Sequence, residues 1–276
     1  MAKIVCYTSP ARGHLFPTVP VLLELARRGH EVVVYTLRDE VERVAKAGLR
    51  ARPVSAEVER IAHDDHAGRS VKEALDRAVR VFVARAAHEV ADLERAIAAE
   101  RPDLLLVDFN AWGASAVAER SGLPWALFMP YFLPWRLPGL PPFGPGLAPR
   151  SDLLGRLRDF VVGQLVHRLI NRNLPRLDEV RAGVGLPGVP HMADQGRTAP
   201  CILYFTAEPF EYACAARPES VVMVGPCAWE PPAETPEWLA RVDRPIVLVT
   251  CSTEYQADGE IVTAALEGLA GEDVFV

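Results

Sequence analysis

The 276-residue sequence has no long uninterrupted hydrophobic segment, although half of its residues are apolar. The longest apolar stretch covers residues 123–135, and Pro124, Pro130 and Pro134 interrupt it. Because a membrane-spanning helix needs about 20 consecutive apolar residues, the sequence predicts no membrane span. The N-terminus reads MAKIVCYTSP, without a basic region followed by an apolar core, so we expect no signal peptide and a cytoplasmic protein.

The sequence also has no excess of positive charge. Its 30 Lys and Arg residues stand against 36 Asp and Glu residues, which gives a formal net charge of −6. Without a basic block or stripe, neither nucleic acid nor an anionic membrane is an expected partner.

Cysteine is scarce, odd in number and never found in CxxC spacing; the five residues are Cys6, Cys201, Cys214, Cys227 and Cys251. We therefore predict a reduced protein with buried thiols, and neither a disulfide framework nor a zinc site. The run His63-Asp64-Asp65-His66 contains metal-binding side chains but has no second ligand group at a suitable spacing. A solvated turn without a metal is the expected structure there.

Three motifs of nucleotide and acyl chemistry are missing as well. The first predicted strand is not followed by GxGxxG, and neither GxxxxGK[ST] nor GxSxG occurs. These absences argue against a dinucleotide site of the Rossmann type, a P-loop and the nucleophile elbow of an α/β-hydrolase.

What the sequence does contain is a regular alternation of strand and helix patterns. Short apolar runs rich in β-forming residues predict strands at residues 3–8, 31–36, 49–54, 103–108 and 124–129. Helical spacing predicts helices at residues 18–28, 38–47, 70–100 and 114–120, with a loop at 9–17. The fold class is therefore α/β, with a Rossmann-like, doubly wound parallel sheet.

The second half of the chain begins with an irregular segment, residues 130–150, that contains seven prolines. Patterns further on predict helices at 152–170 and 174–181, strands at 201–205, 221–224 and 246–250, a helix at 260–269 and a new strand from 273. One β-α unit cannot bury its own apolar faces. We therefore divide the chain into a first domain (1–225), a linker (226–244) and the start of a truncated second domain (245–276).

His14 and Asp108 are predicted to face one crevice. His14 follows the first strand, and Asp108 ends the fourth. In the strand order 3-2-1-4-5 these strands are neighbours, and ligands bind where their carboxyl ends diverge. An imidazole there can act as a general base, while a carboxylate on its other ring nitrogen fixes the tautomer and stabilises the imidazolium. A base and its partner without a protein nucleophile suit the activation of a substrate hydroxyl.

A plainer interpretation of these two residues stays open. Single His and Asp residues in loops are often solvated, and Asp108 could instead cap the helix that starts near residue 111.

Large apolar side chains gather in or just after the loops that follow the fourth and fifth strands: Trp112, Met129, Tyr131, Phe132, Trp135 and Phe143. Aromatic residues usually belong to a core. Their concentration in a proline-rich loop at the crevice end predicts an apolar wall for a flat or lipophilic ligand.

Four segments of the sequence carry a family resemblance. GHLFPTVPVLLELARRGHEVVVYT, residues 13–36, strongly resembles the opening of inverting nucleotide-sugar glycosyltransferases of the GT-B fold. The nearest group is similar to the bacterial enzymes that glycosylate macrolides, enediynes and other natural products, which are related to the UDP-glycosyltransferases. Three further segments look like the fourth-strand region, the interdomain linker and the first donor-domain strand of that group: residues 101–128, 221–232 and 245–256.

The resemblance implies a two-domain enzyme whose first domain binds a lipophilic or aromatic acceptor and whose second binds a UDP- or TDP-sugar, with no metal or other cofactor. The family's catalytic histidine falls on His14 and its partner aspartate on Asp108. We expect Phe16 and the six apolar residues named above to bind the acceptor, and Gly13, Ser252 and Thr253 to bind the donor.

One departure from the family is large: its HGGxGT-type donor motif is absent from these 276 residues. We therefore expect little nucleotide-sugar binding and no turnover by this chain alone. Two alternatives remain at this stage. One is a non-catalytic module that binds a small molecule in the same crevice. The other is a different GT-B enzyme, such as an epimerase or a lipid-linked sugar transferase, for which residues 10–13 are poor in glycine.

Overall fold

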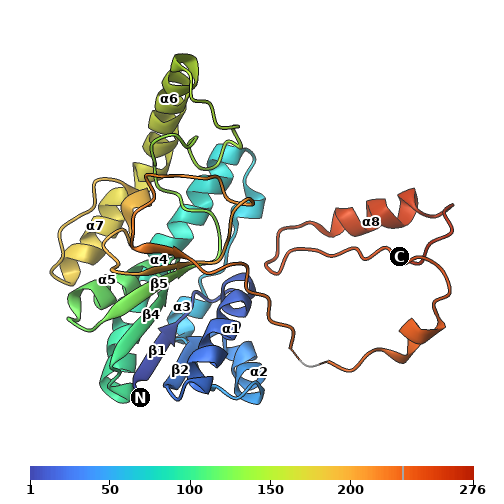
Figure 1. The fold of residues 1–276 in the computed structure, drawn as a ribbon, viewed down its shortest axis with the longest axis horizontal. Coiled ribbons are helices and arrows are strands. Elements are labelled where there is room, and N and C mark those ends of the chain that lie inside the picture. The colour runs from blue at the N-terminus through green and yellow to red at the C-terminus, as the bar shows by residue number, and fades with distance from the viewer. Residues whose placement is uncertain (232) are drawn as a thin grey trace.

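The computed structural model describes residues 1–231 and 233–276, and these residues form one parallel sheet flanked by helices (Figure 1). The strands are β1 (Lys3–Tyr7), β2 (Glu31–Thr36), β3 (Arg50–Pro53), β4 (Leu104–Asp108), β5 (Trp125–Met129), β6 (Ile202–Tyr204) and β7 (Val221–Met223). Their spatial order is β3-β2-β1-β4-β5-β6-β7, with every neighbouring pair parallel. This confirms the predicted doubly wound sheet, whose order reverses between β1 and β4.

The helices are α1 (Arg12–Arg27), α2 (Val41–Lys46), α3 (Ala56–Glu59), α4 (Val71–Glu100), α5 (Trp112–Arg120), α6 (Leu153–Ile170), α7 (Leu174–Gly183) and α8 (Gly259–Gly268). Short 3-10 turns, η1 to η5, cover Arg38–Glu40, Asp65–Ala67, Asn171–Asn173, Met192–Asp194 and Glu237–Arg241. Within the described part of the chain, no helix combines the length and the hydropathy that a membrane crossing requires.

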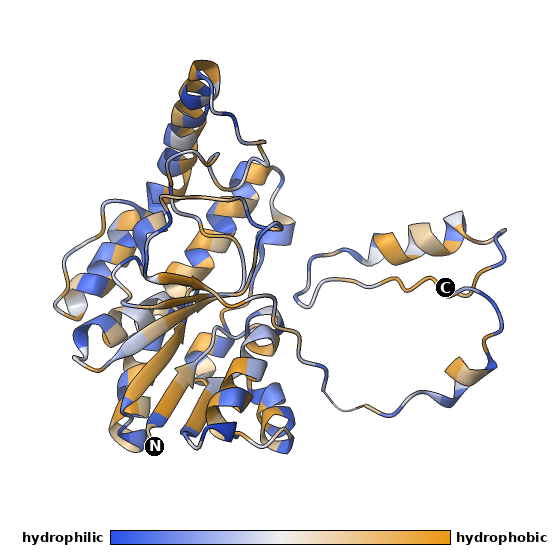
Figure 2. Cartoon of the chain, viewed as in Figure 1, coloured by the Kyte–Doolittle hydropathy of each residue, from blue (hydrophilic) through white to orange (hydrophobic). Residues whose placement is uncertain are grey.

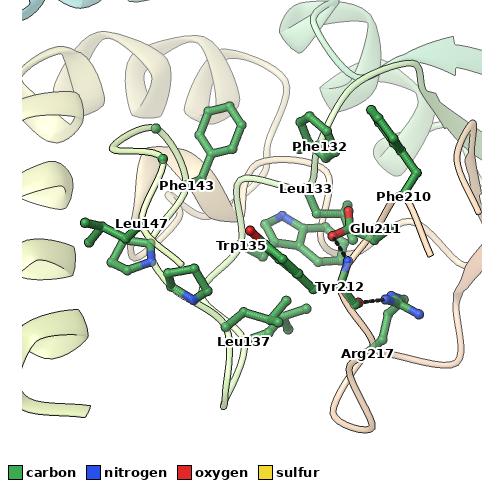
Figure 3. A pocket seen from close by; sticks show the side chains of 15 residues that line it. Phe132, Leu133, Trp135, Leu137, Phe143, Leu147, Phe210, Glu211, Tyr212 and Arg217 are labelled. Atoms are coloured by element: carbon green, nitrogen blue, oxygen red, sulfur yellow. Dashed lines mark hydrogen bonds between the residues drawn. The ribbon is translucent and has the colours of Figure 1, made fainter. Parts of the chain in front are cut away.

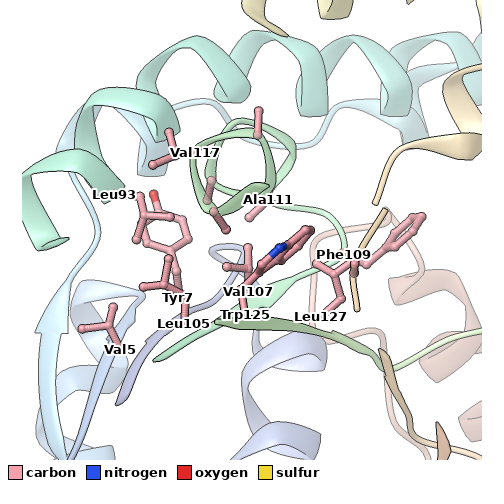
Figure 4. Packing of buried hydrophobic residues seen from close by; sticks show 14 of the residues in the cluster. Val5, Tyr7, Leu93, Leu105, Val107, Phe109, Ala111, Val117, Trp125 and Leu127 are labelled. Carbon is pink, nitrogen blue, oxygen red and sulfur yellow. The ribbon is translucent and has the colours of Figure 1, made fainter. Parts of the chain in front are cut away.

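Successive side chains of a strand point to opposite faces of the sheet, and both faces are buried. Val5 of β1 packs in a cluster with Leu93 of α4 on one face (Figure 4). Cys6, the next residue, packs with Leu15 of α1 on the other face. The central strands β1, β4 and β5 are accordingly mostly hydrophobic, whereas the helices carry hydrophilic residues as well (Figure 2).

Helix α1 begins at Arg12, within the segment that the sequence predicted as a loop, so that prediction was wrong. Pro17 lies inside this helix, although proline lacks a backbone donor and disfavours helix interiors. Packing overrides this preference, since Leu15 is completely buried against the sheet. The hydroxyl of Thr18 also donates a hydrogen bond to the carbonyl of His14 (2.9 Å). The early start places His14 in the first turn of α1.

Residues 245–276 lie apart from the sheet, on the right in Figure 1. The strands predicted at 246–250 and 273–276 are replaced by a single parallel bridge between Ile246 and Phe275. A strand is stable only when neighbours complete its hydrogen bonds and cover its apolar face, and the described residues provide neither. Leu248, in the middle of the first predicted strand, is 83% exposed. The helix predicted here is present as α8.

Helices α4 and α5 touch at Gly113, in the first turn of α5. A β-carbon at this position would lie 1.9 Å from the carbonyl oxygen of Ala86 on α4. The backbone N–H of Gly113 also donates to the buried carboxylate of Glu89 (2.9 Å). Because α5 follows β4 after a short turn, this contact also fixes the end of β4, where Asp108 lies.

We expect Gly113→Ala to lower the free energy of unfolding by about 1–3 kcal/mol, because the added methyl group must push α4 and α5 apart. Urea unfolding at constant m-value measures the change. Gly183→Ala, at the end of α7, is the matched control: nothing lies within 4 Å of its β-carbon position. The control should match or exceed wild-type stability. Equal midpoints for the two variants would contradict the packing argument.

Candidate active site

His14 is placed at the crevice by the turn from β1 into α1. Ala11 precedes the helix in an extended conformation, and its carbonyl accepts hydrogen bonds from the backbone N–H of His14 (3.1 Å) and of Leu15 (3.0 Å). The His14 side chain therefore leaves the first helical turn above the carboxyl end of β1. It lies beside β4, the neighbouring strand.

Asp108, the last residue of β4, meets His14 there. Nδ1 of His14 lies 2.8 Å from Oδ2 and 3.0 Å from Oδ1 of Asp108. The His14 side chain is 17% exposed and that of Asp108 is fully buried. A carboxylate can only accept hydrogen bonds, so Nδ1 carries the hydrogen and is the donor to Asp108. Nε2 is left facing the crevice.

Two backbone groups hold the Asp108 carboxylate in place. The N–H of Ser9 donates to Oδ2 (3.2 Å), and the N–H of Asn110 donates to Oδ1 (2.8 Å). Helix α5 has Ala111 as its N-cap residue, with no side-chain cap bond. Asp108 therefore orients His14 and the β4–α5 turn, and does not cap α5.

The second ring nitrogen of His14 also has a partner. Nδ2 of Asn110 lies 3.2 Å from Nε2, and the amide oxygen of Asn110 accepts a hydrogen bond from the hydroxyl of Tyr131. The ring of Tyr131 stands edge-on to the imidazole, with centroids 5.8 Å apart. Sequence reasoning missed Asn110, and the only signal was its place two residues after Asp108.

Opposing effects set the pKa of His14. Burial lowers this pKa, but the charge of Asp108 and the hydrogen bond to Asp108 outweigh burial. The net pKa therefore lies above its ordinary value. Glu254 acts in the same direction, whereas the buried guanidinium of Arg85 opposes it. For His63, burial and then Arg85 lower the pKa to about 4. The site thus holds two imidazoles whose pKa values are shifted in opposite directions.

A cavity of about 350 Å³ surrounds His14. Its wall includes His63, whose ring packs against Phe82, so the expectation that residues 63–66 form only a solvated turn was incomplete. In the described part of the chain no group of three or more metal-ligating side chains comes together. The C-terminal segment closes one side of this cavity through Thr253, Glu254 and Gln256.

The residues expected to contact a donor lie around the meeting point of α1 and this C-terminal loop. Gly13 lines the cavity, and a β-carbon on it would lie 3.4 Å from the hydroxyl oxygen of Thr253. Ser252 is exposed and does not line it; its backbone N–H donates to the carboxylate of Asp258 (2.7 Å).

Apolar cavities lie beside the His14 cavity. One of about 400 Å³ is enclosed by Phe132, Trp135, Phe143, Phe210 and Tyr212, whose side chains converge in Figure 3. Its walls come from the loop after β5 and from the segment after β6. The latter contributes Phe210 and Tyr212, for which the sequence gave no distinctive signal.

Shared walls connect these spaces. Tyr131 lines both the His14 cavity and a second apolar cavity of about 520 Å³, while Phe132 lines that cavity and the one in Figure 3. The second apolar cavity therefore adjoins the His14 cavity at Tyr131 and the cavity of Figure 3 at Phe132.

Three residues expected on the acceptor wall lie elsewhere. Met129, at the end of β5, is completely buried in the sheet core. Trp112 is buried under Phe82, in the cluster between α4, α5 and α7. Phe16 packs edge-on against Trp229. Met129 and Trp112 fill the core, Phe16 is partly buried at its edge, and none of the three lines a cavity described above.

Comparison with known proteins shows where the chain belongs. No protein-family model matches it. It is 34% identical over 294 aligned positions to 4'-demethylrebeccamycin synthase of Lentzea aerocolonigenes, which covers 100% of this chain and 69% of the relative. It is 26% identical over 284 positions to demethyllactenocin mycarosyltransferase of Streptomyces fradiae, covering 97% of the chain and 56% of the relative. The chain thus spans between about half and two thirds of the length of these relatives.

Solved structures agree on the fold. The glycotransferase of kitacinnamycin superposes with a TM-score of 0.67 at 19% identity, over 99% of this chain and 64% of that one. The spinosyn rhamnosyltransferase SpnG, solved with thymidine diphosphate, gives a TM-score of 0.60 at 19% identity, over 99% and 64%. The fold is that of the GT-B glycosyltransferases, and the chain belongs to the bacterial glycosyltransferases of natural-product biosynthesis.

We expect Asp108→Asn to lower the pKa of His14, because burial and Arg85 are then opposed only by the weaker effect of Glu254. An NMR titration of the histidine ring signals measures this directly. Asp103→Asn, an exposed residue at the other end of β4, is the control and should leave the pKa unchanged. The same pKa in all three proteins would contradict the assigned role of Asp108.

Proposed function

We propose that this chain is the acceptor-binding part, with the first segment of the donor-binding part, of an inverting O-glycosyltransferase. The enzyme transfers a sugar from a UDP- or TDP-sugar to a hydroxyl of a lipophilic natural product. Residues 1–225 form the acceptor domain, 226–244 the linker and 245–276 the start of the donor domain. The observation that carries the proposal is the His14–Asp108 pair, buried at the point where the strand order of the sheet reverses.

In the proposed reaction, Nε2 of His14 is the general base. The acceptor oxygen attacks the anomeric carbon while its proton passes to Nε2, and the bond from that carbon to the diphosphate breaks. The nucleoside diphosphate leaves with the electron pair on the side opposite the attack, so the configuration inverts. Asp108 accepts from Nδ1–H throughout and stabilises the imidazolium that forms.

The acceptor site is the apolar space that begins at Tyr131 and continues past Phe132 to Phe143. Aromatic walls of this kind favour flat, lipophilic molecules. Because Tyr131 also lines the His14 cavity, a molecule bound there can present a hydroxyl to the base.

The donor site is proposed where Gly13 approaches Thr253. The proposal invokes no metal ion. Backbone N–H groups at the start of α1 and side chains of the donor domain stabilise the charge on the departing diphosphate. Homology to transferases supports sugar transfer over a non-catalytic binding module, which has no need of a base with an orienting carboxylate.

In a completed enzyme, His14→Ala should reduce transfer by about 10²–10⁴-fold, because the acceptor hydroxyl then loses its proton acceptor. The enzyme for this test is a chimera in which the chain is joined to the part of 4'-demethylrebeccamycin synthase that it does not match. Turnover is measured with a TDP-sugar and a panel of aromatic alcohols. The fall should appear in kcat more than in KM.

His88→Ala, an exposed histidine on α4, is the control for this measurement and should leave transfer unchanged. Transfer by His14→Ala at the rate of the control would remove His14 from the mechanism.

The 276-residue chain should bind the aromatic alcohol 4-methylumbelliferone, and Phe132→Ala and Phe143→Ala should each weaken binding about two- to tenfold through lost aromatic contact. Isothermal calorimetry supplies the dissociation constants. Leu154→Ala, an exposed residue on α6 that lines none of these cavities, should bind like wild type. If all variants bind 4-methylumbelliferone with equal affinity, the acceptor binds at a different site.

A further inference from the structure

The atom proposed to act as base, Nε2 of His14, is covered in this structure. The side-chain amide of Asn110 lies against it, with Nδ2 3.2 Å away. Asn110 is itself 7% exposed and Tyr131, its other partner, is partly buried, so few water molecules can reach this group of side chains. The reaction proposed above makes no use of either residue's polar group.

The direction of the hydrogen bonds follows from Tyr131. Burial, followed by the charge of Asp108, raises the pKa of Tyr131 well above 10, so its hydroxyl keeps its proton and donates. It donates to the amide oxygen of Asn110, which turns the amide nitrogen toward His14. Nε2 must then accept, while Nδ1–H donates to Asp108. The four side chains form one chain of donors that runs from Tyr131 to Asp108.

We propose that Asn110, tethered by Tyr131, is a positioning residue that covers Nε2 of the neutral His14 imidazole and opposes its protonation until an acceptor hydroxyl replaces the amide. This inference rests on the proposed function, in which Nε2 receives the proton. An imidazole nitrogen has a single lone pair, so the amide N–H and an incoming hydroxyl compete for it.

This competition for the lone pair of Nε2 favours an aromatic acceptor over water. An aromatic acceptor gains contact with the apolar walls at Phe132 and so displaces the amide with the help of its own binding. Water has no such contribution and must displace the amide hydrogen bond alone. Without the amide, water can donate to Nε2, attack the anomeric carbon and release the free sugar and the nucleoside diphosphate. Asn110 therefore suppresses hydrolysis of the donor.

Several charged or titratable groups face His14 and contribute to its titration in any variant. Asp108 comes from β4, Arg85 from α4 and Glu254 from the C-terminal loop. His63 faces the same cavity from the loop before η2. Asp65 of η2 and Tyr131 line this cavity as well. Of all these groups only Tyr131 changes below, in Tyr131→Phe, so the Asn110 variants report on Asn110.

The first measurement needs no activity. NMR titration of the 276-residue chain gives the pKa of His14, assigned with His14→Gln. We expect Asn110→Ala to raise this pKa by about half a unit to one unit, since the neutral imidazole loses one hydrogen bond. Asn110→Asp should raise it further, because a second carboxylate then favours the imidazolium. Tyr131→Phe should also raise it, since the amide is then free to turn its oxygen toward Nε2–H and stabilise the imidazolium.

The second measurement uses the chimera defined above and compares donor hydrolysis with transfer. Asn110→Ala should raise the ratio of hydrolysis to transfer by about three- to tenfold, the effect of one hydrogen bond. Asn173→Ala is the matched control, since Asn173 is also 7% exposed but bonds to Asp76, at the junction of α4 and α7. It should change neither the pKa nor the ratio.

The outcomes separate the two proposals. If Asn110→Ala and Tyr131→Phe leave the pKa of His14 unchanged, the covering role is wrong, whatever the turnover. If the pKa shifts as expected but His14→Ala still transfers sugar, the covering role stands and the base has been misassigned. Should Asn110→Ala fail to fold, Tyr131→Phe tests the same chain of hydrogen bonds.

Discussion

The hydrogen bond between His14 and Asp108 joins two parts of the chain that are 94 residues apart, and the site depends on it. It exists because β1 and β4 lie side by side, in a register that pairs Tyr7 with Val107. Packing on both sheet faces sets that register, since a shift by one residue would exchange the side chains that face α4 with those that face α1. The core packing that sets the strand register therefore also sets the position of the His14 imidazole.

The polar groups at the end of β4 have hydrogen-bond partners. The Asp108 carboxylate accepts from two backbone N–H groups and one ring N–H, so little freedom remains for it. The close contact of α4 with Gly113 holds the following helix, and the β4–α5 turn cannot move without disturbing that contact. The imidazole is thus oriented by backbone that the fold itself makes rigid.

The sheet, its strand order and the approach of His14 to Asp108 could be predicted because they follow from periodicity and from a general rule of α/β topology. Helix starts were harder: Pro17 signalled a loop, and only burial of Leu15 against the sheet shows why the helix continues through it. Trp112 and Met129 could not be assigned correctly, because composition does not tell which side of an element faces the core. Asn110 was missed, since its role depends on Tyr131, a contact that no local pattern contains.

The His14–Asp108 pair and most of the apolar cavity walls stand on different elements, so substitutions can affect one without the other. His14 stands on α1 and Asp108 on β4, whereas most of the apolar walls stand on the loop between β5 and α6 and on the segment after β6. Substitutions at Phe143 or Phe210 alter the shape of the cavity without touching a residue that orients His14. In the proposed enzyme, acceptor range and proton transfer can therefore evolve independently, and new acceptors are best sought by varying these two loops on an unchanged sheet.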